Sequence, residues 1–215
     1  MNFIAATIEL KQHLPEPIEA YGLTFKAADG VIPHAKEDNQ VNFRVLCYDK
    51  SSKLETFGGW APGKRVLITG QLMFPDTVGD PFDLIVNTIE PNTPADMYVN
   101  QVVLSDSFFT KEGPKKQNNG SLKVSIGCKN DNSDSATFLA LEAPEQLHKK
   151  LSERHRGSRK LSVVGQLREW DTGKKAYRAI VATNFSNPAD YDKNKAKAQT
   201  GSAGGYDSID PVPDY

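Results

Sequence analysis

Cysteine is scarce in this chain of 215 residues, which contains only Cys47 and Cys128. Two cysteines cannot form a disulfide framework or complete a zinc site by themselves. We therefore expect a reducing setting, either the cytoplasm (nucleoid-associated) or the interior of an organelle. The chain also has no apolar run approaching the ~20 residues that span a bilayer, so no membrane partner is expected. Its first residues lack the basic and apolar pattern of a secretory signal.

Signatures of catalysis and metal binding are missing as well. The sequence contains no H-E-x-x-H, no G-x-S-x-G and no Walker A motif. Its histidines form no ligand pattern; they are His13, His34, His148 and His155. We therefore expect no enzymatic activity, no cofactor and no metal site.

The chain as a whole has no excess of charge of one sign, but its segments do. Lys and Arg number 26 and Asp and Glu 27, which gives a net charge of −1 and argues against a protein that coats a polyanion. Residues 1–94 hold 8 basic and 12 acidic side chains (8 − 12 = −4), and residues 95–188 hold 15 and 10 (15 − 10 = +5). Residues 189–215 hold 3 and 5 (3 − 5 = −2). The near-neutral total is thus an average over segments of opposite sign.

What the chain does contain is an internal repeat. The tripeptide Gly-Gln-Leu at residues 70–72 recurs at 165–167, a shift of 165 − 70 = 95. The same shift aligns further apolar and aromatic residues, among them Phe43 with Phe138 and Phe82 with Tyr177. One shift that holds across the chain predicts two copies of one fold, over residues 1–94 and 95–188, and then a tail over 189–215.

Both copies show the same order of elements. Apolar residues alternate with polar ones as in half-buried strands, and three such segments precede a short helix that two further strands follow. We expect strands at 3–10, 23–27, 41–46, 65–72 and 82–89, and at 98–105, 122–126, 136–141, 160–167 and 177–185. Helices are expected at Leu54 and Phe57, capped by Ser51 or Ser52, and between Pro144 and Gly157. This order predicts an all-β chain of two tandem five-stranded OB-fold barrels with one short helix each.

The last hairpin of the second copy has the residues that single-stranded nucleic acid requires. Bases stack on aromatic faces and phosphates need cations, and this loop binds ligands in OB-folds. The candidates are Arg168, Trp170, Lys174, Lys175, Tyr177 and Arg178. The matching hairpin of the first copy keeps Phe74 and Phe82 as candidate stacking faces, but acidic residues replace the cations and should weaken binding there. We expect Trp60 to pack inside the first copy.

A strand that begins with Phe, a helix and a strand that begins with Lys and ends in Gly-Gln-Leu lead into the last hairpin; the strand segments are 43–45, 64–72 and 82–86, and again 138–141, 160–167 and 177–181. This combination resembles bacterial-type single-stranded DNA-binding proteins, over both copies. The resemblance implies binding of single-stranded DNA without strong sequence preference, in replication, recombination or repair. It adds Phe138 to the candidate site. It also implies a homodimer that presents four OB-folds. The acidic first copy departs from the family, and we expect it to serve assembly or partner contact rather than DNA binding.

The tail is expected to be a flexible linker with an acidic tip. By the same resemblance, this tip would dock replication or repair proteins, although its ending departs from the family's usual Ile-Pro-Phe. The tip residues are Asp207, Ile209, Asp210, Pro211, Val212, Pro213, Asp214 and Tyr215. Two other interpretations stay open. The chain could be an OB-fold interaction module or accessory subunit with weak or no DNA binding, or an OB-fold protein that binds RNA.

Overall fold

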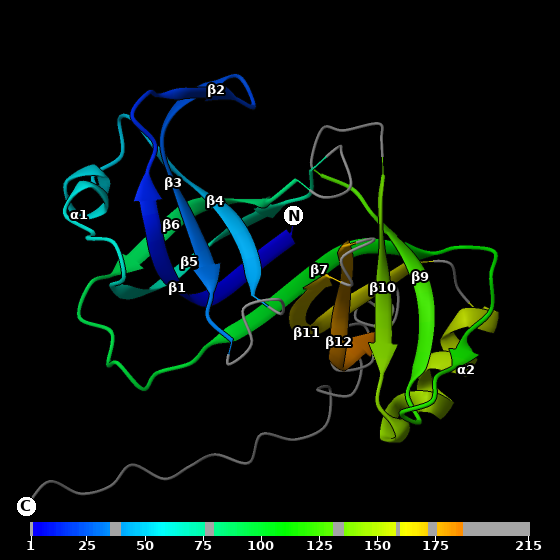
Figure 1. Ribbon diagram of the computed structural model, residues 1–215. Coiled ribbons are helices and arrows are strands. Elements are labelled where there is room, and N and C mark those ends of the chain that lie inside the picture. Colours follow the sequence, from blue (N-terminus) through cyan, green and yellow to red (C-terminus); the bar gives the residue numbers. More distant parts are fainter. Residues whose placement is uncertain are drawn as a thin grey trace, which may run out of the picture.

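Two β-barrels lie side by side in the computed structural model, which describes residues 2–34, 40–75, 80–130, 136–157, 160–171 and 176–186. Figure 1 shows them joined along β1 and β7, with helices α1 and α2 on the outer sides of the pair. The chain therefore has the all-β architecture of two tandem OB-folds that its element order predicts.

The first barrel consists of five long strands, a short arm and a short helix. Its strands are β1 (Asn2–His13), β3 (Leu23–Ile32), β4 (Val41–Tyr48), β5 (Arg65–Met73) and β6 (Phe82–Glu90). The arm is β2 (Ile18–Ala20), and the helix is α1 (Leu54–Gly58). The residue that caps α1 is Lys53 rather than a serine, but its amide donates to the Ser51 hydroxyl (3.1 Å), so Ser51 still satisfies a donor near the helix start.

The second barrel repeats this plan. Its long strands are β7 (Asn100–Phe109), β9 (Leu122–Cys128), β10 (Thr137–Ala143), β11 (Lys160–Asp171) and β12 (Ala176–Ser186). Its arm is β8 (Lys115–Lys116), and its helical segment consists of the 3₁₀ turn η2 (Glu145–Leu147) and α2 (His148–Gly157). Leu151 anchors α2 because its side chain is fully buried in the core.

Both barrels close in the same way. In the first, the order β3-β4-β6-β5-β1 is closed by antiparallel pairing of β1 with β3, and β4 and β6 pair in parallel. In the second, β7 closes on β9, and β10 and β12 pair in parallel. One buried apolar cluster fills both interiors, so the two barrels share a continuous core.

The repeated Gly-Gln-Leu marks a bulge at the same place in each barrel. Register shifts between Thr69 and Gly70 in β5 and between Val164 and Gly165 in β11. A side chain at either glycine would overlap the carbonyl of the opposite strand, which belongs to Ile85 or Val181. Glycine is required here because the bulged backbone approaches its partner strand so closely.

The barrel registers correct the alignment of the two copies by one residue in two strands. Leu167 pairs with Ile180 as Leu72 pairs with Leu84, so the shift is 95 in the Gly-Gln-Leu strand but 180 − 84 = 96 in the strand after it. The shift is also 96 in β10, because paired residues of the parallel strands are separated by the same number of positions in both barrels. Phe138 is therefore the counterpart of Asn42 rather than of Phe43, and such a slip moves a side chain to the opposite face of the sheet.

Candidate nucleic-acid interface

Strand alternation places two aromatic rings on the outer side of the second barrel. Leu139 and Leu141 of β10 are buried in the core, so Phe138 points outward and is 59% exposed. In β12, Ile180 is buried, and Tyr177 is 37% exposed. The parallel register pairs Ala140 with Ala179. Phe138 and Tyr177 each precede this pair by two residues, so they occupy the same level and the same face of neighbouring strands.

A third ring extends this surface toward β7. Phe108 is half-buried and contacts Phe138 edge-on, with ring centroids 6.3 Å apart. It lies over Gly127 of β9, where a Cβ atom would collide with the ring. Gly127 is the register partner of Phe138, so the absence of a side chain leaves the space that Phe108 fills. We call the outward surface of Phe108, Phe138, Tyr177 and Lys123 the aromatic face.

Cations accompany these rings. The Lys123 ammonium lies 5.8 Å from the Tyr177 ring centroid, within range of a cation–π interaction. Lys115 of the β8 arm is the register partner of Lys123 and is exposed, as is Arg168 on β11. Arg168 pairs with Ala179, next to Tyr177 along the same face. Arg168 was predicted from the sequence. Phe108, Lys115 and Lys123 were not, although the alternation of residues 122–126 indicates which side of β9 faces outward.

Arg178 does not belong to this surface, contrary to the sequence-based expectation. It follows Tyr177, so its side chain points to the opposite side of β12, where it is only 8% exposed. Its guanidinium pairs with Glu169 (3.3 Å), lies 4.5 Å from the Phe82 ring centroid and donates to the Asp80 carbonyl. Glu169 in turn accepts from the Asn42 amide (3.2 Å). Arg178 therefore holds the two barrels together.

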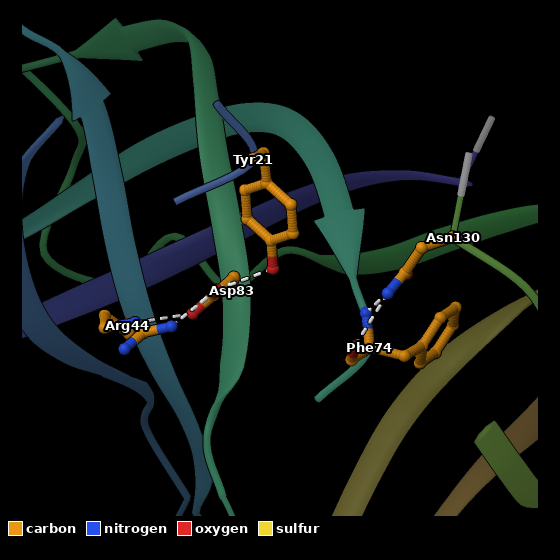
Figure 2. A network of polar contacts seen from close by, with 5 residues as sticks. All are labelled: Tyr21, Arg44, Phe74, Asp83 and Asn130. Atoms are coloured by element: carbon orange, nitrogen blue, oxygen red, sulfur yellow. Dashed lines mark hydrogen bonds and ion pairs between the residues drawn. The ribbon is translucent and has the colours of Figure 1, made fainter. Parts of the chain in front are cut away.

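Phe74 and Phe82 are also corrected, because both rings are buried. They contact each other in a T-shaped arrangement, with centroids 6.0 Å apart, and Phe82 contacts Phe43 at 5.8 Å. An amide clasp fixes Phe74 further: the Asn130 side chain accepts from its amide and donates to its carbonyl, each at 2.8 Å (Figure 2). Neither ring has a free face for a base. Trp60 is buried as expected, and its indole donates to the Lys64 carbonyl (2.7 Å).

On the first barrel, the surface that corresponds to the aromatic face is filled by the chain itself. Arg44 of β4 and Asp83 of β6 form a bidentate ion pair with both N–O distances at 2.7 Å. The Tyr21 hydroxyl donates to the same carboxylate at 2.7 Å (Figure 2). The hydrogen bonds that Arg44 donates to Asp83 are the largest cause of the raised pKa of Arg44.

The β2 arm covers the rest of this surface. Phe25, Ala27 and Leu46 form a small buried cluster of their own on the outer side of β3 and β4. Leu14 and Ile18, from the arm and the segment before it, pack against this cluster. The two barrels thus share a fold but present different outer surfaces.

Several predicted residues lie outside the described part of the chain. These are Lys174 and Lys175, the side chain of Trp170, and the tail residues 207–215. The backbone of Trp170 is described and pairs with Tyr177. Within the described ranges, no three His, Cys, Asp or Glu side chains gather as a metal site, and no helix has the length and apolarity to cross a membrane.

Comparison with known proteins supports the fold. No family model and no curated protein sequence matches the chain. Its structure is similar to that of the wild-type single-stranded DNA binding protein from Thermus aquaticus and to that of a deletion mutant of the same protein. In both cases the TM-score is 0.55 and the identity 18%, and the match covers 87% of this chain and 93% or 94% of the other. At this identity the likeness shows the tandem-barrel fold.

Proposed function

We propose that this chain binds single-stranded DNA without strong sequence preference through the aromatic face of its second barrel. The observation that carries the proposal is the pair of exposed rings, Phe138 and Tyr177, at one level of neighbouring strands. Bases stack on such rings whatever their identity, because every base has a π-face. Lys123 and Phe138 lie on β9 and β10, the second and third long strands of the barrel, and these two strands form the ligand surface of OB-folds. A role in protecting DNA during replication, recombination or repair follows from this activity.

Phosphate contacts would come from cations around the rings. Lys123 belongs to the face, and Lys115 and Arg168 border it. Lys174 and Lys175 belong to the hairpin that connects β11 and β12, and we assign them the same task. Trp170, the register partner of Tyr177, is the remaining stacking residue of the proposal.

The first barrel has an assembly role in this proposal. Its net charge of −4 (8 − 12) repels phosphate, and its own β2 arm and the Arg44–Asp83 pair occupy the corresponding surface. A homodimer would present four barrels, two of each kind. The acidic tip at residues 207–215 would dock replication or repair proteins.

One titration tests the proposal. Oligo-dT is added to the protein while tryptophan fluorescence is followed at several salt concentrations. Because Trp60 is buried in the first barrel, a change in emission reports Trp170, and a Trp170→Phe variant serves as the control. Phosphate contacts from Lys115, Lys123 and Arg168 alone predict that log K falls with log[salt] with a slope of about −2. Absence of binding at low salt would refute the proposal.

A second candidate is an interaction module that contacts proteins rather than DNA. The filled surface and acidic charge of the first barrel favour it. It predicts no change in fluorescence with oligo-dT, even at low salt. Equal affinity for oligo-U and oligo-dT would indicate RNA as an equal ligand, since stacking alone does not distinguish the two polymers.

A further inference from the structure

A pocket of about 280 Å³ lies at the junction of the two barrels. Its walls come from both: Ile32, His34 and Val41 belong to the first barrel and the loop after β3, and Gln166 and Arg168 belong to β11. Tyr98, from the segment that connects the barrels, completes it. The pocket therefore depends on the joining of two barrels and has no equivalent in one alone.

The tyrosine ring at this pocket is exposed but held in place. Tyr98 is 53% exposed, and its hydroxyl accepts a long hydrogen bond from the Asn100 amide (3.4 Å). Asn100 is itself buried. Its side chain donates to the Leu167 carbonyl (2.8 Å) and accepts from the Leu167 amide (3.1 Å), so it bonds to the backbone of β11 as a neighbouring strand would. It fixes one end of the ring, and the exposed part of Tyr98 lines the pocket.

The size and chemistry of the pocket suit one nucleotide. Its volume lies just below the ~300–1,000 Å³ typical of small-ligand pockets, so it has room for a base rather than for a larger ligand. Tyr98 offers a stacking face, Gln166 an amide, and Arg168 a guanidinium that can pair with a phosphate. Among the described residues that line it, none is acidic.

The pocket also continues the path of the aromatic face. Sheet order places β10, β12 and β11 side by side, and the pocket lies against β11. A strand that crosses Phe138 and Tyr177 therefore reaches Arg168 next, since Arg168 is the register partner of Ala179. Neighbouring strands are only ~4.8 Å apart, so no long gap separates the face from the pocket.

We propose that this junction pocket takes one further nucleotide of the DNA strand bound on the aromatic face, with the base on Tyr98 and the phosphate on Arg168. The inference rests on the proposed function, which supplies the strand. It assigns the first barrel a share in DNA binding that its own outer surface does not provide. It also predicts that affinity depends on strand length, because a short strand covers the aromatic face alone.

The test compares the wild-type protein with Tyr98→Ala and with Tyr98→Phe, which keeps the ring and loses only the long hydrogen bond. Affinity is measured for oligo-dT of increasing length at one low salt concentration. We expect equal affinities for the shortest strands that bind, and then, above one length, a loss of about 5- to 150-fold for Tyr98→Ala alone. An abasic site moved along the long strand should weaken wild-type binding at one position without weakening Tyr98→Ala there.

The outcomes separate the two proposals. If the wild-type protein binds and Tyr98→Ala matches it at every length, the pocket proposal is overturned and the proposed function stands. If the wild-type protein binds no strand of any length, both are overturned. Because Tyr98 is exposed, we expect the three proteins to have similar melting temperatures. Similar values establish that a loss of affinity is not due to unfolding.

Discussion

Replacement of Phe138 by alanine should weaken DNA binding without unfolding the protein. The ring is 59% exposed, and its contact with Phe108 is an edge-on aromatic pair, worth about 0.5–1.5 kcal/mol. We therefore expect the free energy of unfolding to fall by only about 1 kcal/mol. Loss of one stacked base should cost about 1–3 kcal/mol of binding, which corresponds to about 5- to 150-fold in Kd.

The assay is fluorescence anisotropy of labelled oligo-dT at one low salt concentration, with urea unfolding of each variant alongside. Phe3→Ala is a matched control, because Phe3 is another exposed phenylalanine but lies on β1 opposite Gln71, away from the aromatic face. It should leave Kd unchanged. Wild-type affinity in Phe138→Ala, or an equal loss in both variants, would refute the assignment of the face.

Three further predictions concern stability and reactivity. Arg178→Met should lower the free energy of unfolding by about 3–5 kcal/mol in urea, since it leaves a buried carboxylate unpaired; a change below about 1 kcal/mol would contradict its role between the barrels. Gly165→Ala should cost about 1–3 kcal/mol in the same assay because its Cβ would overlap the opposite strand, whereas Gly113→Ala, which has open space around it, should be nearly neutral. Burial raises the pKa of the Cys128 thiol to about 12 and also raises that of Cys47, so both should react with a disulfide reagent at pH 8 only after denaturant is added; rapid labelling of the native protein would contradict this.

The element order could be predicted from the sequence because strands and turns leave local signals. Alternating apolar residues indicate the strands, and the repeated Gly-Gln-Leu indicates the same position in each barrel. The structure explains why the repeated residue is glycine, since the bulge at Gly70 and Gly165 leaves no room for a side chain. The short arms β2 and β8 were missed, because segments of three and two residues carry no periodic pattern.

The side of the sheet on which a residue lies was harder to predict. A shift of 95 paired Phe43 with Phe138, but the barrel registers need 96 in that strand, so one ring is buried and the other exposed. Both barrels have the same bulge, so the extra residue lies in the hairpin, between the pair Met73 and Asp83 in the first copy and the pair Arg168 and Ala179 in the second. Tyr177 and Arg178 are likewise on opposite faces of the sheet because they are neighbours in one strand, although both belong to the same aromatic and basic hairpin.

Contacts between the barrels could not be predicted, because they join residues far apart in the chain. The sequence predicts Arg178 as a surface cation. In the structure its guanidinium contacts the Phe82 ring and the Asp80 carbonyl of the first barrel. Phe74 loses its free face for a related reason, since Asn130 of the second barrel clasps its backbone. Only the packing of one barrel on the other decides between a binding residue and a structural one.

The most direct test of DNA binding on the aromatic face is ultraviolet cross-linking of the full chain to oligo-dT, followed by peptide mapping of the linked residues. We predict cross-links at Phe138 and Tyr177 on the aromatic face, and with longer strands at Tyr98 as well. Cross-links confined to residues 2–90, on the barrel whose surface is filled by its own arm, would contradict it.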